Sequence, residues 1–172
     1  MSTNVSEDII NKALVTYIAK NTRYLTAAQI SKKENDIFLK AEFSIKESCY
    51  LSPGSGHFNA IEALMCFNQM FYVTMLAGIE KKLFPFYEDI TPDDFNQNRR
   101  SVYILELEKI KFKKQIDNND FHGILEFKPL HRIKNRIYID CRLGFGNDEA
   151  CDSFSGNIKL FIPIIETKKT PA

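Results

Sequence analysis

The sequence lacks an excess of either charge, a close pair of cysteines and a segment typical of a secretion signal. Its net charge of +1 leaves no electrostatic footprint for nucleic acid or an anionic membrane. The four cysteines form no CxxC pair and have no histidine at metal-ligand spacing, so neither a metal nor another cofactor is predicted. The opening residues, MSTNVSEDIINKALVTY, are acidic early and have no basic start, so we expect a cytoplasmic protein with reduced thiols.

Two runs invite other interpretations. The run KIKFKK (109–114) alternates cations with apolar residues, which indicates one solvated face of a strand rather than a nucleic-acid site. Residues 60–79 are long and apolar enough to cross a membrane. However, Glu62, Asn68 and Gln69 would be costly in lipid, and no second span exists to satisfy them. We therefore interpret this run as a helix enclosed by protein, with no membrane span.

Hydrophobic periodicity predicts the order of elements. An amphipathic spacing predicts a helix over 5–20 with Ser6 as its cap, and alternation predicts a strand over 36–45. Turn residues at 51–56 predict a loop before a long helix that begins near Asn59 and ends near Gly78. The later period-two segments predict antiparallel strands at 101–116, 121–133, 136–145 and 155–164. Without repeats or linkers, residues 1–172 form one domain with short flexible ends at 1–5 and 166–172.

A helix that is apolar on nearly every face must be covered on nearly every face. A strongly curved antiparallel sheet wrapped around it meets that requirement. The sequence therefore predicts an α+β hotdog fold, with one long central helix and an extra N-terminal helix. Pairing such sheets edge to edge removes an exposed edge, so we expect a homo-oligomer built from dimers.

Candidate site residues gather at the start of the long helix and along one of its faces. Asn59 stands where an N-cap belongs, and the free N–H groups behind it could also hold a thioester oxyanion. His57 precedes it by two residues and is either structural or catalytic. Asn68 lies in an apolar stripe with Tyr72, where an unpaired buried amide costs about 1–3 kcal/mol, so structure and function are both open for it. Glu62 and Gln69 lie seven residues apart on the neighbouring face of the helix. We expect them to form hydrogen bonds with backbone groups or with a partner subunit.

The segment GHFNAIEALMCFNQMFY (56–72) closely resembles the signature of the FcoT-like hotdog family of acyl-thioester enzymes. Other segments also fit the family layout, and the similarity extends over about residues 8–164: NTRYLTAAQ, SIKESCY, DDF and SGNIKLFIPI. The resemblance implies an acyl-thioester site at a dimer interface. Its polar residues would be Tyr50, Asn59 and Asn68, with Tyr17 as a further candidate.

The family includes long-chain fatty acyl-CoA thioesterases and enzymes that add glycine to the β-carbon of a (2E)-enoyl-acyl carrier protein, as in isonitrile lipopeptide biosynthesis. Hydrolysis needs a general base or a nucleophile, and the carboxylate usual on the central helix of hotdog thioesterases is absent beside Asn68. This favours glycine addition over hydrolysis. Hydration or dehydration is weakened because the acid expected after a histidine is also absent there. A non-catalytic acyl-thioester binding subunit is a further alternative.

For glycine addition we predict that the turn at Gly56 lets the thioester approach the helix start. Backbone N–H groups of residues 58–60 would then polarise its carbonyl. Asn59 and Asn68 would orient the glycine amine, while His57 or Tyr50 exchanges protons. The predicted substrate-binding residues are Gly56, Phe58, Tyr72 and Tyr17. For the glycine carboxylate, Arg132 and Arg142 are the predicted cations. The expected partners are an acyl carrier protein or coenzyme A thioester, and glycine.

Overall fold

The computed structural model describes residues 2–50 and 56–163 of the chain. The predicted loop before Gly56 and the predicted flexible end at 166–172 lie outside these residues. The elements follow in this order: β1 (Ser2–Asn4), α1 (Glu7–Ile18), β2 (Leu25–Lys33), β3 (Asp36–Phe43), α2 (Ala60–Glu80), α3 (Pro92–Asn98), the 3₁₀ turn η1 (Arg99–Ser101), β4 (Tyr103–Phe112), β5 (Phe121–Phe127), β6 (His131–Ile133), β7 (Arg136–Gly146) and β8 (Phe154–Pro163).

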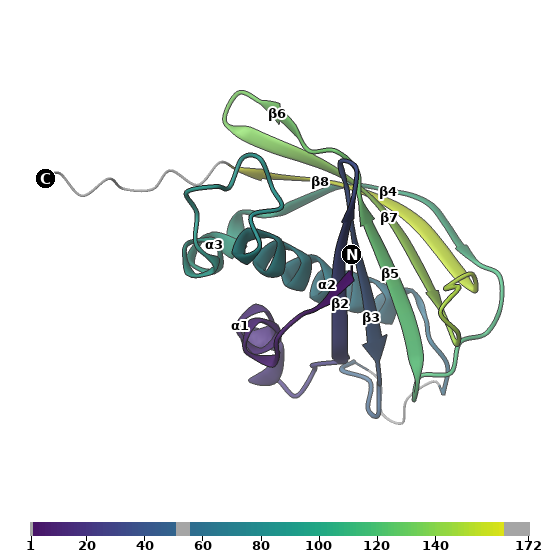
Figure 1. The fold of residues 1–172 in the computed structure, drawn as a ribbon. Helices are drawn as coiled ribbons and strands as arrows, with labels where there is room; N and C mark the ends of the chain where they lie inside the picture. The colour runs from purple at the N-terminus through teal and green to yellow at the C-terminus, as the bar shows by residue number, and fades with distance from the viewer. Residues whose placement is uncertain (1, 51–55, 164–172) are drawn as a thin grey trace, which may run out of the picture.

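A single antiparallel sheet curves around α2 (Figure 1). Its strands lie in the order β1-β2-β3-β5-β7-β8-β4, and β6 pairs with β7. Strict alternation lets β8 bury every second side chain from Phe154 to Ile162, as expected for a sheet with one covered face. The predicted hotdog architecture, including the N-terminal helix, is confirmed.

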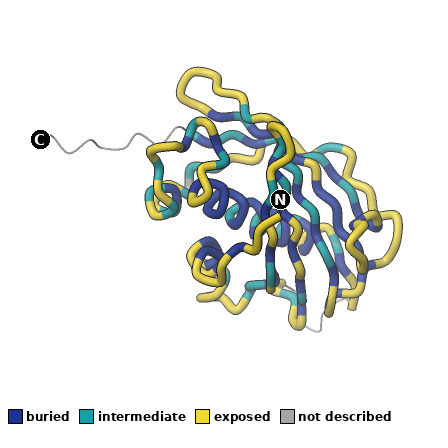
Figure 2. Tube along the Cα trace, viewed as in Figure 1, coloured by how far each residue is buried: buried dark blue, intermediate teal, exposed yellow. Residues whose placement is uncertain are grey.

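Helix α2 is the centre of the core, and Figure 2 shows it buried along most of its length. Its length and hydropathy would also suit a membrane span, but 67% of its most apolar window is buried inside the protein. The sheet covers one side, and α1 packs on α2 through Ile9, Ile10, Ala13 and Leu14. The hydrophobic effect of enclosing these apolar faces is therefore what holds sheet and helices together.

One stripe of α2 stays partly open in the single chain. It consists of residues spaced three and four apart, so that they share a face. These residues, here called the open stripe, are Ile61, Leu64, Met65, Asn68 and Tyr72. Ile61 is 49% exposed, although the sequence pattern predicted a helix covered on nearly every face. The open stripe is thus an apolar surface that the protein's own sheet does not cover.

Four parts of the fold differ from the sequence-based expectation. Residues Ser2–Asn4 pair with β2, and the Val5 N–H donates to Ala28 O at 2.9 Å, so the flexible start predicted at 1–5 is wrong for these residues. Strand β2 and helix α3 were not predicted. The strand predicted over 121–133 is divided into β5 and β6.

Candidate active site

Asn59 caps α2 through a reciprocal capping box. Its Oδ1 accepts hydrogen bonds from the N–H groups of Ile61 (3.0 Å) and Glu62 (3.3 Å), and the Glu62 carboxylate accepts from Asn59 N at 3.2 Å. The predicted N-cap is confirmed. Because Oδ1 is fully used by the cap, only the Asn59 Nδ2 group is left to interact with a substrate.

The backbone donors at the helix start are fewer than predicted. The Phe58 N–H donates to Ile116 O at 3.2 Å, and the Asn59 N–H is taken by Glu62. The prediction that both polarise a thioester carbonyl is therefore wrong. In the described chain the Ala60 N–H, at the first helical position, has no partner. The available donors are thus Ala60 N–H and Asn59 Nδ2.

A pocket of about 560 Å³ opens at this point, between residues 57–60 and residues 112–115 at the end of β4; we call it the helix-start pocket. His57 is exposed and lines it, directly after Gly56, whose φ of +70° is one that glycine adopts without strain. Phe58 is only 3% exposed and packs on Phe121 and Phe145, with ring centroids 4.9 and 5.0 Å away. This aromatic anchor fixes the position of the pocket's helical wall.

An apolar cavity of about 40 Å³ adjoins the helix-start pocket through their common wall at Ala60. Its lining comes from α2, β4, β7 and β8 and includes Leu64, Ile110 and Gly156. An added Cβ at Gly156 would lie 3.5 Å from Ile110 Cγ1, so the glycine helps to keep this space open. The helix-start pocket combines the polar side chains of His57, Asn59 and two lysines with apolar walls, and its volume suits a small-molecule group, whereas the adjoining cavity is too small to hold an acyl chain.

Asn68 lies further along the helix than the pocket. At about 1.5 Å per residue it is roughly 13 Å from Asn59 along the axis. Its side chain is partly exposed and has no hydrogen-bond partner in the described chain. Asn68 is therefore not a structural amide of this protomer, but the single chain does not bring it into the helix-start pocket.

Tyr17 and Tyr72 lie together near the next turn of the open stripe. The Tyr72 hydroxyl donates to Arg99 O at 3.4 Å, and the Arg99 guanidinium stands 4.3 Å from the centre of the Tyr72 ring. Burial, reinforced by Tyr72 and opposed by Arg99, raises the pKa of Tyr17 to about 12. The Tyr17 phenol thus stays protonated at neutral pH and can donate a proton but not act as a base.

Residue Gln69, adjacent to Asn68, has a structural role. It is fully buried, its Oε1 accepts from the N–H groups of Tyr24 (2.9 Å) and Leu25 (3.0 Å), and its Nε2 donates to Thr22 O at 2.9 Å. The expectation that Gln69 satisfies backbone groups is confirmed. Its particular partners come from a segment far away in the sequence, so no local pattern identified them.

Helix α2 presents no carboxylate on the open stripe. Its acids are Glu62, which is 0% exposed and part of the capping box, and the exposed Glu80 at the C-terminal end. Glu62 Oε2 also accepts from Asn118 Nδ2 at 3.5 Å, while Oε1 has no partner among the described residues. Burial raises the pKa of the Cys66 thiol well above its usual range, which removes it as a nucleophile. Neither a general base nor a thiolate is therefore available on this helix.

The remaining predicted residues lie elsewhere. Tyr50 is 43% exposed and is not among the described residues that line the helix-start pocket. Arg142 is 67% exposed and contacts Glu126 at 3.7 Å, and exposed Arg132 donates to Lys134 O. Neither arginine lines the helix-start pocket of the single chain, so this pocket gives no support to their predicted carboxylate-binding role, which stays a prediction.

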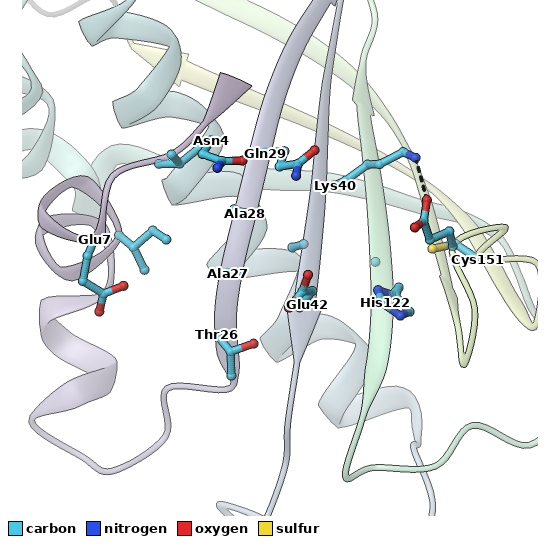
Figure 3. A pocket seen from close by; sticks show the side chains of 15 residues that line it. Asn4, Glu7, Thr26, Ala27, Ala28, Gln29, Lys40, Glu42, His122 and Cys151 are labelled. Carbon is cyan, nitrogen blue, oxygen red and sulfur yellow. Dashed lines mark hydrogen bonds and ion pairs between the residues drawn. The ribbon is translucent and has the colours of Figure 1, made fainter. Parts of the chain in front are cut away.

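A second hollow, of about 460 Å³, crosses strands β2, β3 and β5 and is bordered by the start of α1 and the β7–β8 loop (Figure 3). An ion pair between Lys40 and Glu149, 3.4 Å apart, lies on its rim, and Glu42 and His122 point into the same region. None of the predicted site residues lines it. Within the described residues no cluster of three or more His, Cys, Asp or Glu could hold a metal ion.

Residues 12–162 match the family model of the FcoT-like thioesterase domain. The chain belongs to this family. This FcoT-like chain is 28% identical over 159 residues to the (2E)-enoyl-[ACP] glycyltransferase of Mycobacterium tuberculosis, covering 91% of this chain and 86% of that protein. It is 26% identical to the protein of the same name from Streptomyces coeruleorubidus, over 73% and 75% of the two chains.

Among solved structures, a hypothetical thioesterase protein from Streptococcus pneumoniae, with coenzyme A, aligns with a TM-score of 0.47 at 9% identity. The alignment covers 90% of this FcoT-like chain and 99% of the other. At this level of similarity the alignment carries no weight for function. The family predicted from residues 56–72 is confirmed by the family model.

Proposed function

We propose that this FcoT-like protein adds the amine of glycine to the β-carbon of a (2E)-enoyl group held as a thioester on an acyl carrier protein. The observation that carries the proposal is the neutral character of the open stripe: it offers the Asn68 amide and no carboxylate. A carboxylate there would hold the attacking amine as an unreactive ammonium. The names of the curated relatives support the same reaction.

The available donors suit conjugate addition. Ala60 N–H and Asn59 Nδ2 would bind the thioester oxygen and stabilise the negative charge that develops on it. The amine nitrogen then forms a bond to the β-carbon, and the π electrons move through the α-carbon to the thioester oxygen. The nitrogen loses one proton and the α-carbon gains one, so no other reactant is consumed. His57, on the rim of the same pocket, would exchange these protons.

We further propose that the site is completed by a second copy of the chain. Strand β4 is one of the two edge strands of the sheet, opposite β1, and carries exposed apolar residues, including Leu105 and Phe112. Pairing two such edges about a two-fold axis would cover β4 and the open stripe together. Asn68 of one protomer would then approach the helix-start pocket of its partner, where it orients the amine. The four unpaired thiols fit a reducing compartment, and we propose the cytoplasm.

Thioester hydrolysis is the second candidate, because the family model is that of a thioesterase domain. Hydrolysis requires a base that activates water, and Glu62, the acid that bonds to Asn59 in the pocket wall, is fully buried. This observation favours addition over hydrolysis.

The test gives purified protein a (2E)-decenoyl carrier-protein thioester with and without glycine, and follows the intact carrier by mass spectrometry. The proposal predicts a carrier heavier by one glycine, formed only when glycine is present. Release of free fatty acid at the same rate with or without glycine would assign the protein to the thioesterases. If no product forms in either reaction, the protein would instead be a non-catalytic subunit that binds acyl thioesters.

A further inference from the structure

Glycine brings a carboxylate to the reaction, and the helix-start pocket must compensate its charge. The exposed arginines Arg132 and Arg142 do not line this pocket. The cations that do are Lys113 and Lys114, which follow directly after β4. The choice of a carboxylate-binding residue therefore lies between two neighbouring lysines.

These two lysines differ in their charge environment. Lys114 Nζ lies 3.3 Å from both carboxylate oxygens of Asp152, so its charge is already compensated. Lys113 makes no ion pair in the described part of the chain. Its backbone N–H donates to Ser153 O at 2.7 Å, which holds the base of the side chain against the β7–β8 loop. Lys113 thus borders the same pocket as His57 and Asn59 and carries a charge with no ion-pair partner among the described residues.

We infer that Lys113 binds the carboxylate of the amino-acid co-substrate, an inference that rests on the proposed function. Binding the carboxylate there points the amine toward the interior of the pocket. The nearby positive charge also disfavours the ammonium form of that amine, because like charges repel, and so increases the share of the nucleophilic neutral form. Lys113 would therefore both bind and activate glycine.

The phosphate of the carrier's pantetheine arm is another anion that a lysine could bind. The two anions are distinguished by which substrate loses affinity when the charge is removed. A carboxylate role changes the KM for glycine, whereas a phosphate role changes the KM for the enoyl carrier thioester. Glycinamide, which has an amine but no carboxylate, separates the cases further.

The experiment measures steady-state addition by wild type, Lys113→Gln and Lys113→Arg, with Lys111→Gln as the matched control. Lys111 is an exposed lysine two residues earlier that does not line the pocket. We expect Lys113→Gln to raise the KM for glycine at least tenfold, and Lys113→Arg to restore most of it. The KM for the enoyl carrier should be unchanged, the rate with glycinamide should fall less than the rate with glycine, and Lys111→Gln should behave as wild type.

An unchanged KM for glycine in Lys113→Gln, or a raised KM for the carrier instead, would overturn the inference. A parallel readout needs no turnover: saturation-transfer NMR of glycine on wild type and Lys113→Gln. If wild type forms no adduct but binds glycine through Lys113, the inference stands and the proposed reaction fails. If wild type neither binds nor adds glycine, both fail.

Discussion

At the scale of single residues, α2 carries two neighbouring amides in opposite situations. Gln69 is fully buried and bonds to three backbone groups of the segment 22–25. Asn68 is partly exposed on the open stripe and has no partner in the described chain. Because a polar group on an apolar surface forgoes packing without gaining a hydrogen bond, we assign Asn68 to the substrate and Gln69 to the fold.

Replacing each amide by alanine separates the two roles. Asn68→Ala should lower the turnover of glycine addition by about 10²-fold, the scale for losing one preorganised donor, and change the free energy of unfolding by less than about 0.5 kcal/mol. Gln69→Ala should lower the free energy of unfolding by about 3 kcal/mol, since two buried N–H groups lose their acceptor. Turnover of the adduct and urea unfolding measure both quantities. Normal turnover in folded Asn68→Ala would make this amide structural.

Residue roles were predictable from the sequence where they depend on neighbours along the chain. Asn59 as a cap follows from its position before an apolar helical run, and the structure has that cap. The prediction for the Phe58 and Asn59 N–H groups was wrong because their acceptors come from the β4–β5 segment and from Glu62. The partners of Gln69 and the position of Lys113 beside the pocket likewise depend on tertiary contacts.

At the scale of elements, strands could be predicted where apolar and polar residues alternate regularly along the chain. Strands β3 and β8 alternate along their whole length and β7 alternates as far as Leu143, and all three lie where the pattern predicts them. Strand β2 has a register shift between Leu25 and Ala27 that breaks the alternation of buried and exposed residues. The sequence pattern therefore did not reveal this strand. Helix α3 is short, but its capping box from Thr91 to Asp94, with Pro92 at the first turn, is a local signal that could have revealed it.

The start of α2 permits a test of the Asn59 donor without loss of the cap. Aspartate caps helices as well as asparagine does, but it has no side-chain N–H group and it adds a negative charge, which also disfavours the neutral amine. Asn59→Asp should therefore keep the free energy of unfolding within about 0.5 kcal/mol of wild type and lower the rate of glycine addition by at least about tenfold. Asn59→Ala should lose about 1 kcal/mol of stability as well as the activity. Thermal unfolding and adduct formation are measured together, and full activity of Asn59→Asp would show that Asn59 only caps the helix.

At the scale of the whole molecule, an uncovered apolar surface runs from β4 to α2. Leu64 of the open stripe and Ile110 of β4 line the same small cavity, so the two exposed regions are continuous. Exposed residues along β4 include Tyr103, Leu105 and Phe112. A contiguous apolar patch on an edge strand is typical of an interaction surface, and we propose that its partner is a second copy of the chain.

Charge placed on this edge should separate the dimer. We expect wild type to be a dimer, or a multiple of dimers, at micromolar concentration, and Leu105→Lys to shift it toward monomer with reduced activity. Ile133→Lys on β6 is the matched control, because Ile133 is 56% exposed and Leu105 is 53% exposed. Light scattering after size-exclusion chromatography measures the mass. A wild-type monomer, or equal dissociation of both variants, would contradict the interface on β4.

The central claim is that a carbon–nitrogen bond forms at the β-carbon while the thioester survives. The most direct measurement supplies ¹⁵N-glycine and a (2E)-enoyl carrier thioester labelled with ¹³C at the β-carbon, and records NMR spectra of the carrier-bound product. We expect a one-bond ¹³C–¹⁵N coupling at that carbon, with the chain still attached to the carrier and the signal strongly reduced in Asn68→Ala. A labelled free acid without ¹⁵N coupling would contradict it.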